Sequence, residues 1–580
     1  MAKFSVTFMK QSLLFLLFIS HLIFAQSQKT PYEKGNGNQT PTYEEMVKFY
    51  DELDAKHQNI FIKTYGLTDS GEPLKVVFFN TEGKFDPKNF KNKSVILINN
   101  GIHPGEPDGI DASMLMLRDF AEGRLKAPKN VILAVMEAYN IGGMLNRGKY
   151  SRANQNGPEE HGFRGNARNY DLNRDFIKTD SRNAITFQEI FQDLNPIYFI
   201  DNHVSNGADY QYTFTYINTN KERLGKVLGN FQNDEMSPRI KEDLLKKGII
   251  STPYVEINGL KPELGYETFM DSPRYATGYT SLFNTLGEVP ETHMLKPYQN
   301  RVKVTYENML STINYIDSNV NKINSLKQKN LAQYQPGMTY GIQWKIDSTK
   351  TKTIEFKGYE AGMKLSEISG KPRLFYDRNK PYTKKIPFYD TYIATKEITI
   401  PKYYVIPQSE WKILEHLKRN RIEMKSLKKD SVITVEVYKI ADYKTYSRAY
   451  EGHYAHYDTK ISATTQPMKF RKGDVLISSN QKGVKYLLET LEPEAVDSFF
   501  NWNFFDNILG QKEYYSDYVF EDTGAAILKN NPKLREALEK KKAEDKKFAD
   551  DGRAQLDWVY RNSEYYEKTH LRYPVFRILN

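Results

Sequence analysis

The sequence of 580 residues contains no cysteine. This absence excludes disulfide bonds, thiolate metal sites, cysteine nucleophiles and a lipid attached to a cysteine after a signal peptide. Histidine occurs only 10 times, so a histidine close to a carboxylate stands out. Long apolar runs are also rare, and beyond the N-terminal segment no stretch is long and apolar enough to span a membrane.

The N-terminal segment has the three parts of a secretory signal peptide. Lys3 and Lys10 precede the apolar run SLLFLLFISHLIFA, which is followed by the small and polar residues AQSQ. We therefore predict a signal peptide over residues 1–25, cleaved near Ala25, and a secreted or periplasmic protein. A membrane anchor is the alternative, but the run is short for a spanning helix. A polar linker over residues 26–41 follows.

The charge of the chain favours no nucleic-acid partner. The formal net charge is +10, but 82 basic and 72 acidic residues are mixed along the sequence. Such mixing is typical of a solvated surface with a basic excess rather than of a concentrated basic patch. We also expect no obligate protein partner and no transmembrane domain once the signal is removed.

Strands and helices alternate in the first half of the chain. Apolar strand-like runs at 94–100, 130–140 and 196–203 are separated by helical patterns at 108–123 and 185–195. Continuous apolar strands between helices predict an α/β fold with a mixed, mostly parallel sheet covered by helices on both faces. Ligands bind such sheets beyond the carboxyl ends of the strands.

The length predicts at least two domains. A long helical pattern near residue 330 closes the first, and short strands with turn residues follow it. We expect a catalytic domain at 42–330 and a β-rich C-terminal accessory region at 331–580. The charged segment at 531–563 is expected to form a helix near the end of that region.

Three residues suggest a metal site at the ends of two strands. His103 and Glu106 form an H-x-x-E pair just after one strand, and His203 follows another. Two imidazoles and one carboxylate are the ligands of many catalytic zinc sites, which keep the fourth position for water. The H-x-x-E spacing alone is common by chance, and N and O ligands also suit other divalent ions.

Two further segments add side chains for catalysis. The loop GFRGNARNYDLNRDF contains Asp171, which could orient a metal-binding histidine, and the pair Asn173 and Arg174, which could grip a carboxylate. The segment GEVPETH supplies Glu288 and Glu291 at a further strand end.

The order of these motifs resembles the zinc carboxypeptidase family, the carboxypeptidase A-like funnelins, in its large secreted bacterial form. HPGE, YDLNRDF and PETHMLKPY carry the resemblance, which covers roughly residues 40–320. It implies that His103, Glu106 and His203 bind one Zn²⁺ ion and that Asp171 forms a hydrogen bond with His103.

The resemblance also implies the roles of the substrate-facing residues. Asn173 and Arg174 would bind the terminal carboxylate, and Arg164 would stabilise the oxyanion, with Arg168 as its rival. Glu291 would be the general base, with Glu288 as the alternative. His293 could also ligate metal, although a surface or supporting role is favoured.

A mobile tyrosine over the substrate is a further feature of the family. Tyr279 is preferred for this role over Tyr275, and Arg274 in the same loop could favour an acidic substrate side chain. The expected activity is hydrolysis of the C-terminal peptide bond of peptides or proteins by a zinc-activated water. The alternatives are a zinc amidase or peptidase acting on peptidoglycan stem peptides or N-acyl amino acids, and a non-catalytic peptide-binding protein.

Overall fold

A nine-stranded mixed sheet forms the centre of the computed structural model, which describes residues 27–86, 90, 93–255 and 261–579. The strand order is β1-β2-β4-β3-β5-β10-β7-β8, and β6 also pairs with β10. The four central strands β4, β3, β5 and β10 run parallel, so the predicted α/β class is confirmed. The strands are β1 (Ile60–Leu67), β2 (Pro73–Phe79), β3 (Ser94–Asn99), β4 (Val131–Met136), β5 (Tyr198–Asp201), β6 (His203–Ser205), β7 (Phe214–Asn218), β8 (Ser251–Pro253) and β10 (Leu286–His293).

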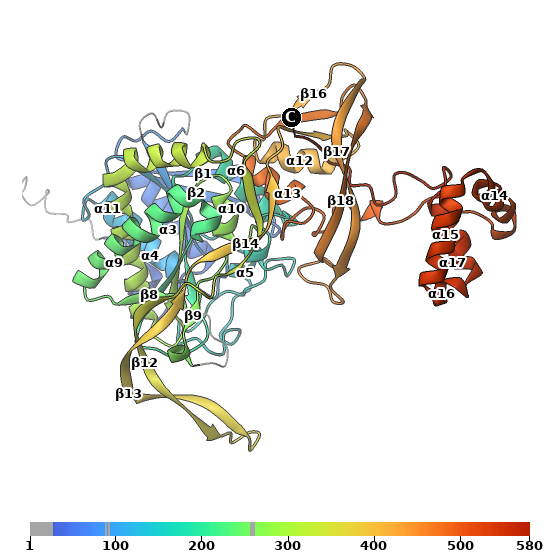
Figure 1. Cartoon of the computed structure of the whole chain (residues 1–580). Helices are drawn as coiled ribbons and strands as arrows, with labels where there is room; N and C mark the ends of the chain where they lie inside the picture. Colours follow the sequence, from blue (N-terminus) through green and yellow to red (C-terminus); the bar gives the residue numbers. More distant parts are fainter. Residues whose placement is uncertain (1–26, 87–89, 91–92, 256–260, 580) are drawn as a thin grey trace, which may run out of the picture.

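Helices cover both faces of this sheet (Figure 1). In β3 the side chains of Val95 and Leu97 enter one hydrophobic core, and those of Ile96 and Ile98 enter the other, as the alternation along a strand requires. One face is covered by α3 (Tyr43–Lys56), α4 (Asp108–Ala121), α8 (Lys226–Asn230), α9 (Ser237–Lys246) and α11 (Tyr298–Leu331). The other is covered by α6 (Arg182–Leu194) and α10 (Ala276–Ser281).

The local sequence explains where these helices begin and end. Thr42 accepts a hydrogen bond from the backbone of Glu45, whose side chain bonds back to Thr42, so the predicted capping box opens α3. Ser181 caps α6 through its hydroxyl, and Asn195 ends that helix in the left-handed conformation. Short segments complete this part: α2 (Pro31–Lys34), α5 (Ile141–Leu145), α7 (Lys221–Leu224), β9 (Tyr266–Glu267) and the turn of 3₁₀ helix at Leu172–Arg174.

The C-terminal region packs against the second face of the central sheet. Tyr404, Ile413 and Tyr486 belong to the same buried cluster as Leu97 and Tyr279. The predicted β-rich character is present as a six-stranded sheet with two helices beside it. Its elements are β15 (Tyr403–Ile406), α12 (Trp411–Arg419), β16 (Lys425–Ser426), β17 (Ser431–Thr445), β18 (His456–Phe470), β19 (Val475–Ser478), α13 (Val484–Leu491) and β20 (Phe576–Ile578).

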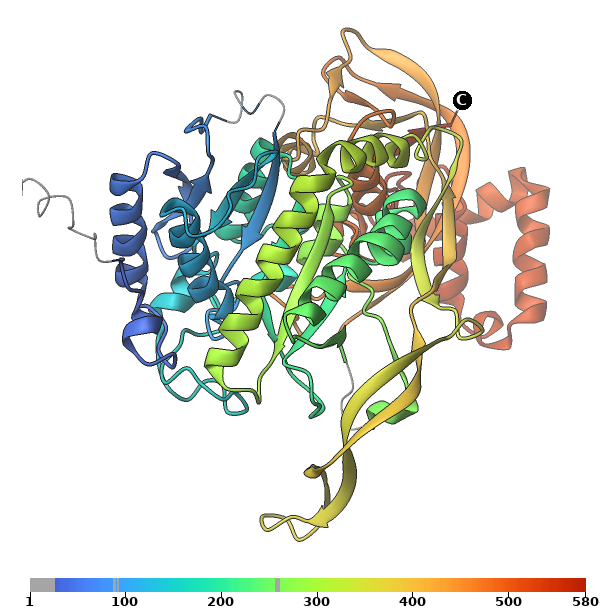
Figure 2. The same ribbon diagram turned by 90° about the vertical axis from the view of Figure 1, so that its left-hand side faces the viewer.

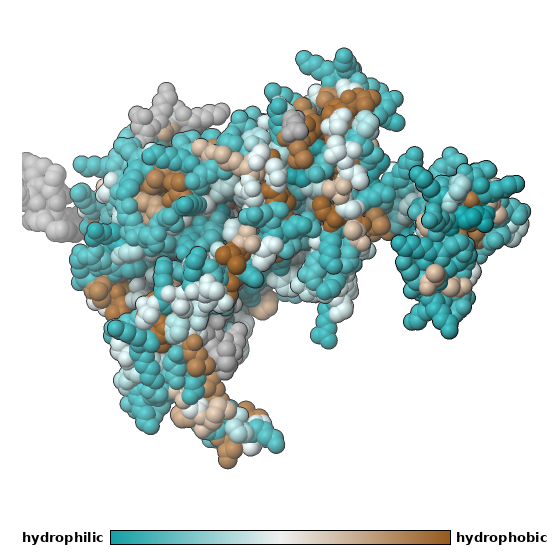
Figure 3. Space-filling model, in the orientation of Figure 1, coloured by the Kyte–Doolittle hydropathy of each residue, from teal (hydrophilic) through white to brown (hydrophobic). Residues whose placement is uncertain are grey.

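A long hairpin extends from the main body as an arm (Figures 1 and 2). It consists of β12 (Lys352–Leu365) and β13 (Pro372–Tyr389), and β11 (Thr339–Ile346) and β14 (Tyr392–Thr399) pair beside its base. Figure 3 shows brown, apolar surface near its tip, where Met363, Leu365 and Ile368 are exposed.

The charged C-terminal segment forms several short helices, whereas the sequence predicted one. Asp545 and Asp551 accept hydrogen bonds from the backbones of Phe548 and Ala554 and so start new helices inside the segment. The helices α14 (Asp517–Asn530), α15 (Pro532–Glu544), α16 (Lys546–Ala549) and α17 (Gly552–Arg561) share a small core of their own. They lie to one side of the main body (Figure 1).

Within the part of the chain that the structure describes, no helix combines the length and the apolarity needed to cross a membrane. The predicted signal peptide at residues 1–25 lies outside the described residues.

Candidate metal centre and active site

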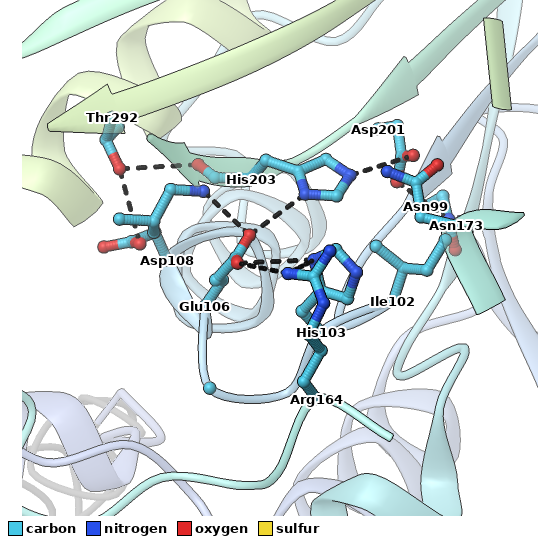
Figure 4. Close-up of polar contacts among 12 residues, drawn as sticks. Asn99, Ile102, His103, Glu106, Asp108, Arg164, Asn173, Asp201, His203 and Thr292 are labelled. Atoms are coloured by element: carbon cyan, nitrogen blue, oxygen red, sulfur yellow. Dashed lines mark hydrogen bonds and ion pairs between the residues drawn. The ribbon is translucent and has the colours of Figure 1, made fainter. Parts of the chain in front are cut away.

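Three buried side chains converge beyond the carboxyl ends of the central strands. His103 and Glu106 lie in the loop between β3 and α4, and His203 is the first residue of β6. One ligand atom from each can be chosen so that all lie within 4.8 Å of one another. Figure 4 shows the two imidazoles directed at the Glu106 carboxylate.

The loop after β3 is tightly folded. Gly101 has φ 63°, a conformation that residues with a side chain rarely adopt, and it turns the chain out of the strand. The Glu106 N–H then donates to the His103 carbonyl at 2.8 Å. The backbone therefore brings two side chains that are three residues apart to the same side.

Two aspartates fix the orientation of the imidazoles. Asp171 Oδ1 lies 3.0 Å from His103 Nε2, and Asp201 Oδ2 lies 3.1 Å from His203 Nε2. Each carboxylate favours a proton on Nε2, which leaves the Nδ1 lone pair for a ligand. The predicted contact of Asp171 with His103 is present. Asp201 was missed by the sequence analysis, although it precedes His203 by two residues and so lies on the same face of the extended chain.

The Glu106 carboxylate is held by donors on both oxygens. Arg152 Nη1 donates to Oε1 at 2.7 Å, and the Val204 N–H donates to Oε2 at 3.0 Å. Burial opposes ionisation, but Arg152 and His103 hold the pKa of Glu106 well below its usual value. Arg152 was not identified from the sequence. It passes so close to Gly105 that a Cβ there would lie 2.5 Å from Arg152 Cδ.

The two glutamates that the sequence offered as general base, Glu291 and Glu288, point to opposite faces of the sheet. Glu291 lines the cavity above the metal centre, and β10 places it in register with His203. Burial raises the pKa of Glu291 to about 8, and its Oε2 has no hydrogen-bond partner among the described residues. Glu288 points to the opposite face, where Lys241 and Asn308 donate to it at 2.6 and 2.8 Å. Three residues along a strand reverse the face, so of the two glutamates only Glu291 lines this cavity.

Of the two arginines considered for oxyanion stabilisation, Arg164 lines the cavity and Arg168 does not. Arg164 donates to Asp171 Oδ2 from Nε at 3.0 Å and from Nη2 at 2.7 Å, and its Nη1 lies 3.8 Å from Glu106. It lines the cavity. Arg168 instead donates to the Asp180 carbonyl at 3.1 Å and lies over the Tyr170 ring.

Asn173 and Arg174 line the same cavity. The Asp171 carboxylate accepts the Asn173 N–H at 2.9 Å and so shapes the turn that presents both side chains. Asn173 Oδ1 is buried and, in the described part of the chain, unpartnered. The Arg174 guanidinium lies 4.6 Å from the centre of the Tyr275 ring, which is a cation–π contact.

The prediction for Tyr279 was wrong. Its side chain is fully buried in α10, packs among phenylalanines of the second core and donates to Asn420 at 2.6 Å. Tyr275 lies at the N-cap of that helix in an extended conformation and lines the cavity. Arg274 is paired with Asp497 at 2.7 Å and does not line this cavity.

His293 is a supporting residue in the structure. It is fully buried, its Nε2 bonds to the Ala208 carbonyl at 3.0 Å, and its Nδ1 accepts the Leu295 N–H at 3.1 Å. Both ring nitrogens are therefore occupied, and the metal-ligand alternative for this residue is excluded.

The cavity has a volume of about 600 Å³. The three metal-type ligands and the arginines form much of its polar part. One part of the remaining wall is mostly apolar or aromatic and includes Ile217, Tyr254, Phe269, Ala276, Thr277 and Val289, and another part is polar and includes Ser151, Asn154, Gln155 and Asn206. The cavity therefore offers both polar groups and an apolar surface to a ligand.

No family model matches the chain, and no curated protein matches it. Among solved structures, a metallocarboxypeptidase from Burkholderia cenocepacia is 14% identical, with 48% of this chain and 69% of that chain covered at a TM-score of 0.35. A Pseudomonas aeruginosa metallocarboxypeptidase in complex with (2-guanidinoethylmercapto)succinic acid is 11% identical, with 48% and 69% covered at 0.36. Carboxypeptidase A from Helicoverpa armigera is 11% identical, with 49% and 75% covered at 0.36.

Proposed function

We propose that this chain is a secreted zinc metallocarboxypeptidase that hydrolyses the C-terminal peptide bond of peptides. The observation that carries the proposal is one cavity in which three buried metal-type ligands meet three arginines and Glu291, whose Oε2 has no hydrogen-bond partner within the described part of the chain. The resemblance of the HPGE, YDLNRDF and PETH motifs supports the same reaction. The predicted signal peptide supports a secreted or periplasmic location.

The residues present fit a zinc ion. Two imidazole nitrogens and one carboxylate oxygen lie within 4.8 Å of one another, and three such ligands leave a fourth position open. The depressed pKa of Glu106 keeps its carboxylate ionised, as a metal ligand must be. A bound zinc ion supplies Lewis acidity and lowers the pKa of water to about 7.

Asn173 and Arg174 bind the terminal carboxylate of the substrate. The Arg174 guanidinium offers a fork of N–H donors to the terminal carboxylate, and Asn173 Nδ2 can add a further donor. The apolar wall near Ile217 and Val289 receives the last side chain. Arg164 lines the same cavity, so we expect the scissile carbonyl to lie beside it when this side chain is buried.

Glu291 is the residue that transfers protons. Its free Oε2 accepts a proton from the attacking water and passes it to the nitrogen of the leaving amine. Arg164 stabilises the oxyanion that develops on the carbonyl oxygen during attack. The Arg164 contacts with Asp171 fix the guanidinium before substrate arrives.

The test is mass spectrometry of a mixed peptide set incubated with the mature protein, with and without a chelator. We expect stepwise loss of single C-terminal residues, abolished by the chelator and restored by zinc. Intact peptides in every sample would reject the proposal, and peptidoglycan stem peptides and N-acyl amino acids would be assayed next. Binding of peptides without any cleavage would favour the non-catalytic alternative.

A further inference from the structure

A loop of the C-terminal region contacts the proposed carboxylate-binding residues. The loop joins β17 to β18, which run beside the main body in Figure 1. Tyr450 and His453 pair across a tight turn, in which Glu451 and Gly452 have φ values of 47° and 82°. The turn therefore presents two successive side chains, those of Tyr450 and Glu451, at its end.

These two side chains bond to neighbouring residues of the YDLNRDF motif. Arg174 Nε donates to the Tyr450 hydroxyl at 2.9 Å. The Asp171 N–H donates to Glu451 Oε2 at 2.9 Å. One contact thus fixes the proposed carboxylate receptor, and the other fixes the backbone of the residue that orients His103.

The loop is itself held in place. His453 Nε2 lies 2.8 Å from Asp180 Oδ2, and the Tyr450 ring is stacked near Trp502 at an interplanar angle of 20°. A side chain at Gly452 would approach the Tyr170 hydroxyl to 3.0 Å. The position of the Tyr450 hydroxyl is therefore determined by contacts on several sides.

The contact decides which edge of Arg174 faces the substrate. Nε donates to Tyr450, and Nη1 donates one proton to the Asn173 carbonyl at 2.9 Å. The Tyr275 ring covers one face of the guanidinium. Among the described residues Nη2 donates no hydrogen bond, so the Nη1–Nη2 edge is the one left for a carboxylate.

We propose that Tyr450 and Glu451 are positioning residues of the carboxylate site, supplied to the catalytic domain by the C-terminal region. The inference rests on the proposed function, because it assumes that Arg174 binds the substrate carboxylate. It assigns a role to the C-terminal region: the loop holds Arg174 in the orientation that recognises a free chain end.

The test compares binding of N-acetyl-Leu-Phe with binding of its C-terminal amide by isothermal titration calorimetry. The parent protein carries Glu291→Gln, so neither ligand is hydrolysed. Tyr450→Phe removes only the hydroxyl and keeps the ring beside Trp502. Tyr454→Phe, at an exposed tyrosine in the same loop, is the matched control.

We expect Tyr450→Phe to raise the Kd of the free acid about 5- to 20-fold, which is less than the loss of a hydrogen bond to a charged group, because the variant removes a contact of Arg174 and no contact of the ligand itself. The Kd of the amide and of the control variant should stay within about twofold. The preference for acid over amide therefore falls, which a general loss of stability would not produce. An equal loss for both ligands, or no loss for the acid, would overturn the inference.

Variants of Glu451 provide a second test, again measured as the preference for the free acid over the amide. Glu451→Gln keeps an oxygen that accepts the Asp171 N–H, whereas Glu451→Ala does not. The preference for the acid should be retained by the glutamine variant and reduced in the alanine variant. Equal behaviour of the two variants would contradict the role of this hydrogen bond.

The binding assay separates this inference from the proposed reaction. If the wild-type protein cleaves no peptide but its acid preference falls with Tyr450→Phe, the reaction is rejected and the positioning role stands. If the wild-type protein cleaves peptides but Tyr450→Phe leaves the preference unchanged, the reaction stands and the inference is rejected.

Discussion

Glu291 and His203 lie opposite each other in register on the neighbouring parallel strands β10 and β6. This pairing places a proton acceptor and a metal-type ligand at the same edge of the sheet. Rigid strands hold the two side chains more precisely than flexible loops would. The other two predicted ligands, His103 and Glu106, reach the same edge from the loop after β3.

Glu291→Gln should abolish turnover while the protein still binds zinc. The amide cannot accept a proton, and loss of a general base costs about 10²- to 10⁴-fold in kcat. The measurement is peptide hydrolysis together with the zinc content of the purified variant.

Glu288→Gln is the control for this variant. It weakens the buried contact with Lys241, so its unfolding temperature should fall, but the folded enzyme should keep its kcat. Wild-type turnover by Glu291→Gln, or loss of turnover only in the control, would exclude Glu291 as the base.

Arg174→Lys should raise KM more than it lowers kcat. Lysine keeps the charge but lacks the planar fork that binds both oxygens of a carboxylate. Loss of one charged hydrogen bond, worth about 1.5–3 kcal/mol, predicts a KM increase of about 10- to 100-fold. Steady-state kinetics with one peptide substrate measure both KM and kcat of the variant. Arg168→Lys, which is outside the cavity, should leave both constants nearly unchanged.

Arg152→Ala should weaken zinc binding. The Arg152 guanidinium lowers the pKa of Glu106, so its loss favours the protonated carboxyl, which is a poor ligand. Loss of such an outer contact typically costs about 10- to 100-fold in metal affinity. Competition with a chromogenic chelator measures the change, and Lys149→Ala, at an exposed residue nearby, is the control. Equal affinity in wild type and Arg152→Ala would show that the ion pair does not support the metal site.

Much of the fold and part of the site followed from local sequence. The runs at β3 and β4 are buried on both faces, and such strands are recognisable because their apolar residues follow one another without alternation, as in Val95–Ile98 and in β4. His103 and Glu106 were found because the loop after β3 holds both within three residues. The position of a side chain at the end of a strand can be predicted from the local sequence, because it depends little on contacts with distant segments.

The remaining site residues depend on contacts distant in sequence. Arg152 reaches Glu106 across 46 residues, and Tyr450 reaches Arg174 across 276. No periodicity marks such residues, because their position is decided by the packing of separate segments. Tyr279 was misplaced for the same reason, since its burial depends on the C-terminal residues Asn420 and Tyr486.

Glu137 predicts how stability depends on pH. It lies just after β4, is buried, and its Oε1 has no partner among the described residues. Burial raises its pKa from 4.5 to about 8. Between these values the unfolded chain releases the proton while the folded protein keeps it, so the free energy of unfolding falls as pH rises.

The slope from this group approaches about 1.4 kcal/mol per pH unit within the window between the two pKa values. Its contribution is therefore complete below pH 4.5 and is lost as the pH rises to about 8. Glu137→Gln keeps the shape of the neutral side chain and cannot ionise. Urea unfolding of both proteins from pH 5 to 9 should give a gain in the variant that grows with pH and levels off above pH 8. Parallel pH profiles would mean that Glu137 ionises equally in the folded and unfolded states.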